Sequence, residues 1–112
     1  MANDYIKTEY LPLSKENHFL RVDLYYSLGG YNVFTYKEER RGYYMSVSPV
    51  EKSRGFETYI AISGTKYCMF EVARKTKKQA ERALVEYENV KSMLVNHVLE
   101  NQGLRLADTV IV

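Results

Sequence analysis

The stretch FLRVDLYYSL, residues 19–28, decides the fold of this 112-residue chain. Its apolar and polar residues alternate, which is typical of a β-strand that buries one face and leaves the other toward water. The residues that we expect on the apolar face are Leu20, Val22, Leu24, Tyr26 and Leu28. Those that we expect on the opposite face are Arg21, Asp23, Tyr25 and Ser27. The sequence therefore predicts a half-buried strand of a sheet.

Turn signals and further β-prone segments follow this strand. The pair Gly29-Gly30 predicts a tight hairpin turn, and charged or polar loops separate the segments after it. These segments predict strands at 31–36, 43–48, 56–62 and 67–72. Pro49 cannot donate a hydrogen bond to a neighbouring strand, so we expect it to end the strand at 43–48 or to place it at an edge. The result is an antiparallel β-meander of four to five strands over about residues 19–72.

The spacing of the apolar residues changes before residue 80. Thr76 and Gln79 have the spacing of a capping box, and Gly103 stands where glycine commonly ends a helix. Between them the apolar residues lie three and four positions apart, as on one face of a helix. They are Ala80, Ala83, Leu84, Tyr87, Val90, Leu94 and Val98. We therefore predict one long C-terminal helix over about residues 77–102, packed on one sheet face, in a single α+β domain of residues 1–112.

The two ends of the chain, 1–14 and 104–112, are predicted to be tails. Residues 5–10, YIKTEY, have the composition of a short strand, and Pro12 would end it. The β-prone end at 109–112 favours an edge strand or pairing with another copy of the chain. One helix covers only one face of the predicted sheet, so we expect the other face to be solvated or to meet a partner.

The overall composition argues against several classes of protein. The 16 basic and 14 acidic residues give a net charge of only +2, so total charge does not indicate nucleic acid. Cys68 is the only cysteine, and its strand neighbours Phe70 and Val72 indicate a buried thiol. His18 and His97 stand in no catalytic motif, and His97, beside the apolar helix face, is expected to be packed. We therefore expect a cytoplasmic protein that is not an enzyme and has no cofactor, metal site, signal peptide or membrane span.

Six cations stand in two groups beside the predicted elements. They are Arg40 and Arg41 before the strand at 43–48, and Arg74, Lys75, Lys77 and Lys78 at the predicted helix N-terminus. Cations at a helix N-terminus oppose the helix dipole and cost some stability. Free N–H groups together with cations also form an anion-binding site. A solvated run and a phosphate-binding run both remain open at this point.

Tyrosine is unusually common in this chain, with 11 residues. Four tyrosines are expected on the polar side of their strands: Tyr25, Tyr36, Tyr44 and Tyr59. Single-stranded nucleic acid is bound by cations that follow its phosphates and by aromatic rings that stack on its bases. Cross-strand aromatic pairs also stabilise sheets without any ligand, so a structural role for these tyrosines remains open as well.

The order of the predicted elements, a strand meander followed by a long helix, resembles a group of single-stranded-DNA-binding folds. These are the Whirly proteins, the PUR-type repeats and the positive-coactivator domain. The resemblance covers about residues 19–102. It implies that the chain dimerises and uses a sheet face for nucleic acid. The chain also resembles small accessory proteins carried by phages and other mobile elements.

These observations lead to one hypothesis and two alternatives. The hypothesis is a non-enzymatic homodimer that binds nucleic acid, preferably single-stranded, with the six cations on phosphates and the four tyrosines on bases. The first alternative is a protein–protein interaction module, such as an inhibitor or accessory factor of a mobile element, that uses the uncovered sheet face. The second is an obligate homodimer that simply buries this face.

Overall fold

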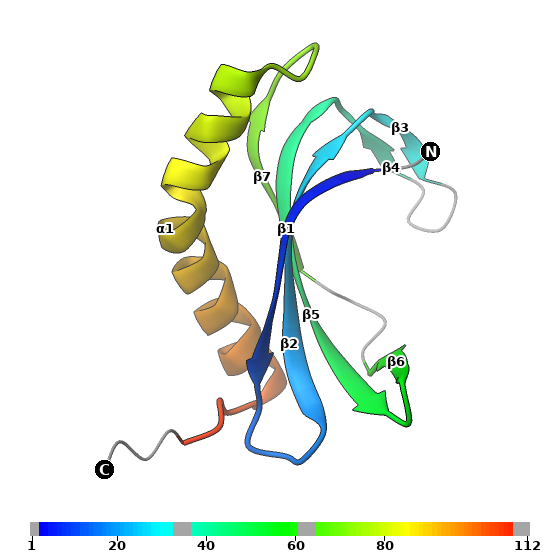
Figure 1. Ribbon diagram of the computed structural model, residues 1–112, viewed down its shortest axis with the longest axis vertical. Helices are drawn as coiled ribbons and strands as arrows, with labels where there is room; N and C mark the ends of the chain where they lie inside the picture. The colour runs from blue at the N-terminus through cyan, green and yellow to red at the C-terminus, as the bar shows by residue number, and fades with distance from the viewer. Residues whose placement is uncertain (1–2, 33–36, 61–64, 109–112) are drawn as a thin grey trace.

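The computed structural model of the protein describes residues 3–32, 37–60 and 65–108, and it has the predicted α+β fold. The main antiparallel sheet contains β1 (Asp4–Pro12), β2 (His18–Ser27), β5 (Gly42–Ser53), β6 (Phe56–Tyr59) and β7 (Thr65–Glu71). β1, β2 and β5 are neighbours in this order, and β6 and β7 both pair with the other edge of β5. β3 (Gly30–Asn32) and β4 (Lys37–Glu39) form a separate two-stranded sheet. The helix α1 (Lys77–Gln102) lies along the main sheet (Figure 1).

The ends of α1 are those that the sequence predicts. The Gln79 N–H donates to Thr76 Oγ1 at 3.2 Å, and the Thr76 N–H donates to Gln79 Oε1 at 3.1 Å, so the capping box is complete. Gly103 takes a left-handed conformation with a φ of 62°, and its N–H donates to the Leu99 carbonyl. Glycine tolerates this conformation because it has no Cβ.

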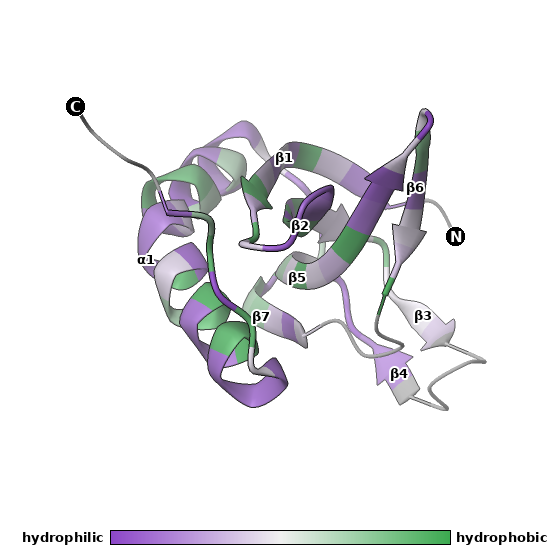
Figure 2. Ribbon diagram, turned by 90° about the horizontal axis from the view of Figure 1, so that it is seen from below, coloured by the Kyte–Doolittle hydropathy of each residue, from purple (hydrophilic) through white to green (hydrophobic). Residues whose placement is uncertain are grey.

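The core lies between α1 and the apolar face of the sheet. Figure 2 shows α1 on one side of the main sheet and the separate β3–β4 sheet on the other side. The sheet contributes Leu20, Val22, Leu24, Tyr26, Tyr43, Met45 and Val47. The helix contributes Ala83, Tyr87, Leu94, Val95 and Val98. The alternation in residues 19–28 thus assigned Leu20, Val22, Leu24 and Tyr26 to the correct face. Asp23, Tyr25 and Ser27 on the opposite face are buried as well, and Leu28 is exposed beyond the end of β2, so the prediction of a half-buried strand is wrong.

β5 continues through Pro49 to Ser53, so the prediction that Pro49 ends the strand or lies at an edge is wrong. Pro49 lies opposite Leu20 of β2, and its carbonyl accepts a hydrogen bond from the Ile60 N–H at 3.1 Å. The nitrogen and carbonyl of one strand residue point to the same side, so the proline nitrogen faces away from β2. Pro49 lies between the part of β5 that pairs with β7 and the part that pairs with β6. The missing N–H therefore interrupts no hydrogen bond to β2.

The chain after Gly29-Gly30 does not return along β2 as a simple meander would require. β2 pairs with β1 and β5, and the segment between β2 and β5 forms the separate β3–β4 sheet. The predicted loop at 37–42 therefore contains a short strand, β4. Residues 33–36 of the strand predicted at 31–36 lie outside the described residues.

A register shift in the pairing of β5 with β7 changes the environment of the cysteine. Tyr43 lies opposite Phe70 and Tyr44 opposite Cys68, so Met69 is an additional residue on β7. Since Tyr43 and Tyr44 point to opposite faces, Phe70 and Cys68 also do. Cys68 is exposed, and the prediction of a buried thiol is wrong.

His97 and the C-terminal segment lie in surroundings that differ from those predicted. His97 is exposed and hydrogen-bonds to Asn101 one turn along α1, so the prediction of a packed histidine is wrong. Residues 105–107 lie beside the end of β1, where Leu106 pairs with Leu13. The β-prone end at 109–112 lies outside the described residues.

Among the described residues, no helix is both long and apolar enough to span a bilayer.

Candidate nucleic-acid interface

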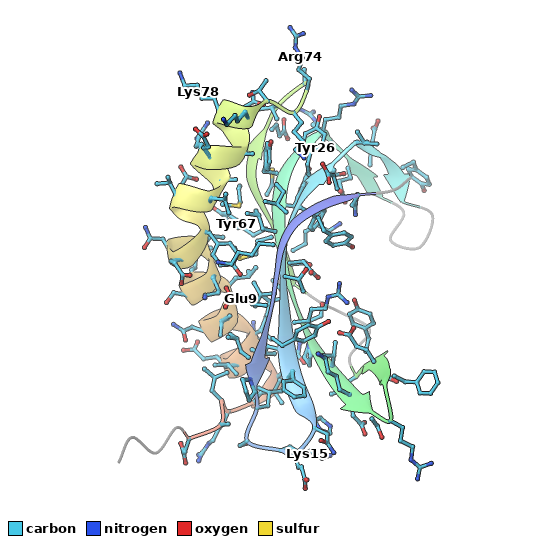
Figure 3. The ribbon with its side chains drawn as sticks, in the orientation of Figure 1. Glu9, Lys15, Tyr26, Tyr67, Arg74 and Lys78 are labelled. Atoms are coloured by element: carbon cyan, nitrogen blue, oxygen red, sulfur yellow. The ribbon has the colours of Figure 1, made fainter. Side chains whose placement is uncertain are left out.

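The two predicted groups of cations meet at one end of the molecule. The Val72 N–H donates to the Arg41 carbonyl at 3.1 Å, so the start of β5 lies beside the end of β7. The connection from β7 to α1 then passes through Arg74. Figure 3 shows Arg74 and Lys78 at this end of the molecule and Lys15 at the opposite end. We call the following set the cationic end: Arg40, Arg41, Arg74, Lys75, Lys77 and Lys78.

Gly42 allows the two cation groups to approach each other. A Cβ at this position would lie 2.5 Å from the Phe70 carbonyl oxygen and 2.9 Å from the Glu71 Cα. Both of these are backbone atoms, which cannot move aside as a flexible side chain can. Glycine therefore permits the close pairing of β5 with β7 that places Arg40 and Arg41 beside the cations of residues 74–78.

The side chains of the cationic end differ in their exposure and in their hydrogen-bond and ion-pair partners. Arg40 has a side chain that is 78% exposed, and its Nη1 lies 3.5 Å from Glu71 Oε2. Lys75 donates to Asp4 of β1, and this hydrogen bond raises the pKa of Lys75. Arg41 donates to two backbone carbonyls rather than to a carboxylate. Within the described ranges, the following cations form no ion pair: Arg74, Lys77 and Lys78.

The first turn of α1 adds to the positive potential of the cationic end. This turn contains no acidic residue, and both Lys77 and Lys78 are exposed. The N-terminus of a helix carries the positive end of the helix dipole, which attracts anions. The cationic end therefore combines exposed side-chain cations with a helix terminus of the same sign.

The four predicted stacking tyrosines do not form one open surface. Tyr25 and Tyr44 lie on the face away from α1, as predicted, but they are only 3% and 6% exposed. Their rings stack on each other with centroids 5.8 Å apart, and burial raises the pKa of Tyr44 to about 12. Tyr59 of β6 is 56% exposed, and Tyr36 lies outside the described residues. In this conformation only Tyr59 of the described three offers an open ring.

Among the described residues, sequence reasoning missed three exposed tyrosines: Tyr5, Tyr31 and Tyr67. Tyr5 pairs with Tyr25 across β1 and β2, and the two ring centroids are 5.7 Å apart. Its neighbour Asp4 contacts Lys75 of the cationic end. The alternation in residues 5–10 could have placed Tyr5 on a sheet face, had this segment been treated as part of the main sheet.

A network of charged and polar side chains occupies the centre of the same sheet face. Arg21 Nε lies 2.9 Å from Asp23 Oδ2, and Arg21 Nη1 lies 3.0 Å from Glu57 Oε2. Thr8 donates to Asp23 at 2.6 Å and Tyr10 donates to Glu57 at 3.1 Å. This network connects β1, β2 and β6. Arg21 is thus neutralised by its own chain and is not a free phosphate contact.

A hollow of about 440 Å³ lies beside this network, next to the β5–β6 turn. Lys52 Nζ lies 3.2 Å from the centre of the Tyr10 ring, and Phe56 at the rim is 75% exposed. The lining residues are Tyr10, Lys52, Ser53, Arg54, Gly55, Phe56 and Glu57. In the described part of the chain, no group of three or more His, Cys, Asp or Glu residues could hold a metal ion.

Comparisons of this chain with protein-family models, with curated proteins and with solved structures find no match. The resemblance to the Whirly, PUR-type and positive-coactivator folds therefore stays a prediction. The function of the cationic end is inferred from the residues and contacts of this chain alone.

Proposed function

We propose that this protein binds single-stranded nucleic acid through the cationic end. The observation that carries the proposal is the meeting of two cation groups that are far apart in the sequence. Arg40 lies before β5, whereas Arg74, Lys77 and Lys78 surround the N-terminus of α1. Exposed cations that are close together contact successive phosphates and release the counterions of the nucleic acid.

The exposed tyrosines favour single strands over duplexes. Tyr5 and Tyr59 are both more than half exposed, and bases of a single strand are free to stack on such rings. Tyr25 packs beside Tyr5 on the neighbouring strand, and because it is buried it is not proposed to contact a base. The protein is proposed to act without catalysis, and the resemblance to dimeric single-strand-binding folds makes a homodimer the expected assembly.

The first test is fluorescence anisotropy of labelled single-stranded and duplex DNA of about 20 bases, titrated at roughly 50 and 200 mM salt. We expect binding of the single strand that weakens steeply as salt rises. A triple charge reversal, Arg74→Glu, Lys77→Glu and Lys78→Glu, should abolish it. Lys15→Glu, a single charge reversal at the opposite end, is the control for position and should retain it. Salt-independent binding, or equal loss in both variants, would contradict the proposal.

The tyrosines provide a second arm of the test. Tyr59→Ala should weaken binding by about 1–3 kcal/mol, the usual range for a base stacked on an aromatic ring. Its thermal stability should remain close to that of the wild type, because the ring is exposed. Tyr44→Ala should instead lower the stability, because the ring is buried against Tyr25. A Tyr59→Ala variant with full affinity would remove this ring from the interface.

Binding of a protein partner is the second candidate, and the exposure of β6 favours it. Phe56, Tyr59 and Ile60 are large apolar residues that stay exposed on and beside this short strand. Exposed aromatic residues are common anchors of protein interfaces. In this case the triple charge reversal should leave capture of the partner intact, whereas Phe56→Ala should weaken it. If the triple charge reversal abolished capture of the partner and Phe56→Ala did not weaken it, β6 would be excluded as the surface that binds the partner.

A further inference from the structure

Arg40 and Arg41 are adjacent in the chain, but their side chains make different contacts. The Arg40 guanidinium is mostly exposed, and in the described part of the chain its one ion pair is with Glu71, at the limit of hydrogen-bond distance. The Arg41 guanidinium donates from Nε to the Leu28 carbonyl at 2.9 Å and from Nη1 to the Ala73 carbonyl at 3.4 Å. The two arginines therefore need not serve the site in the same way.

The contacts of Arg41 connect three separate segments of the chain. Leu28 follows β2, Arg41 itself precedes β5, and Ala73 lies in the connection between β7 and α1. The Arg41 carbonyl also accepts the Val72 N–H at 3.1 Å, so backbone and side chain both contact this connection. Gly29 has a φ of +80°, and a Cβ there would lie 3.2 Å from Arg41 Cγ. The absence of a side chain at Gly29 thus leaves the space through which Arg41 reaches its carbonyls.

We propose that Arg41 is a positioning residue of the cationic end, whereas Arg40 contacts phosphate. This inference rests on the proposed function and deepens it. Arg41 uses donors on two edges of its planar guanidinium group to hold the connection that carries Arg74 into α1. A lysine has a single ammonium group and cannot reach both carbonyls with the same planar geometry. The charge of Arg41 is therefore less important than its shape.

The two roles predict different salt dependences of binding. Arg40→Ala removes a phosphate contact and should lower the slope of log K against log salt by about 1. Arg41→Ala removes no phosphate contact, so the slope should stay as in the wild type. Its affinity should be about tenfold lower at every salt concentration, because the remaining cations are no longer held in register. Arg41→Lys should behave like Arg41→Ala although it keeps the charge.

The experiment measures the four full-length proteins, wild type, Arg40→Ala, Arg41→Ala and Arg41→Lys, by anisotropy with a labelled oligothymidine at three salt concentrations. Amide hydrogen exchange of Val72 and Gln79 is measured on the same samples without DNA. Faster exchange at Val72 in both Arg41 variants, with an unchanged salt slope, supports the positioning role. Arg40→Ala should leave the exchange at Val72 unchanged and serves as the matched control.

Three results would overturn the inference. One is a lower salt slope in Arg41→Ala together with full affinity in Arg41→Lys, which would make Arg41 a phosphate contact. Another is unchanged affinity in Arg41→Ala with faster exchange at Val72, which would make its role purely structural. The third is unchanged exchange at Val72. If the wild type binds no oligothymidine, the proposed function fails and the role of Arg41 in binding is overturned with it, whereas the exchange data still show whether Arg41 holds the connection.

Discussion

At the scale of single residues, Gly42 has a stricter steric requirement than Gly29, Gly55 or Gly103. Its missing Cβ leaves room for the backbone of Phe70 and Glu71, which lies too close for any side chain at this position. The same approach places Arg41 beside Val72. One glycine thus links the packing of the sheet to the assembly of the cationic end.

Gly42→Ala should therefore lower the free energy of unfolding by about 1–3 kcal/mol, the usual cost of forcing extra volume into a packed site. Gly103→Ala is the control, because nothing lies within 4 Å of a Cβ there and only the left-handed φ is strained. We expect the control to lose less stability in urea unfolding. Equal losses in the two variants would show that the contact with Phe70 relaxes easily.

At the scale of elements, β1 and α1 are joined by a polar cluster around Glu9. Tyr87 donates to Glu9 Oε1 at 2.6 Å, and Lys91 Nζ lies 3.1 Å from the same oxygen. Figure 3 shows Glu9 on the side of β1 that faces α1. Lys91 Nζ also lies 3.0 Å from Glu88 Oε2, and these two ion pairs explain why a cation is tolerated beside the apolar residues.

The Glu9 cluster should make stability depend on pH. The hydrogen bond from Tyr87, together with Lys91, lowers the pKa of Glu9 below its ordinary value of 4.5. Because the folded-state pKa is below the unfolded one, this contribution is fully present above about pH 5 and is lost as pH falls through the folded-state pKa. Between about pH 6 and pH 3, Glu9→Gln should therefore lose less stability than the wild type.

Urea unfolding midpoints measured over this pH range test the expectation. Glu100→Gln, at an exposed position of the same helix, is the control and should follow the wild-type curve. Parallel curves for wild type and Glu9→Gln would mean that the cluster does not contribute to the acid sensitivity of the fold.

At the scale of the whole molecule, one helix covers one face of a five-stranded sheet. The other face carries the stacked Tyr25 and Tyr44 and the network around Arg21, and it is not a second apolar core. Most of the hydrophobic stabilisation must therefore come from the layer between α1 and the sheet.

Leu94 and Val85 of α1 test this distribution of stability. Leu94 is 4% exposed within the core layer, so Leu94→Ala should lower the free energy of unfolding by about 2–5 kcal/mol. Val85 is 81% exposed on the outer side of the helix, and Val85→Ala should change it by less than about 0.5 kcal/mol. A large effect at Val85, measured at micromolar protein, would instead reveal that a partner or second copy covers this side of α1.

The features that local sequence specified correctly are those that depend on neighbouring residues. The alternation in residues 19–28 assigned Leu24 to the core and Tyr25 to the opposite face, because successive strand residues point to opposite sides. The ends of α1 followed from Thr76 and Gly103, because capping involves groups within one turn of the helix. The six residues of the cationic end were also recognisable from their charge.

Long-range pairing determined the rest, because strand register depends on segments that are distant in the chain. The pairing of β5 changes from β7 to β6 at Pro49, which is why the strand continues there. The shifted register of β7 exposed Cys68, and the packing of β1 and β5 around β2 buried Tyr25 and Tyr44. The residues that neighbour these positions in the sequence form no pattern that predicts such pairing.

The cationic end illustrates both contributions. Sequence identified its residues, but Arg41 and Ala73 are separated by 32 positions and meet only because β5 and β7 pair closely at Gly42. Charge is a property of each side chain and can be read from the chain directly. Proximity results from the folded backbone, so the position of Arg40 and Arg41 beside the end of β7 follows from tertiary packing.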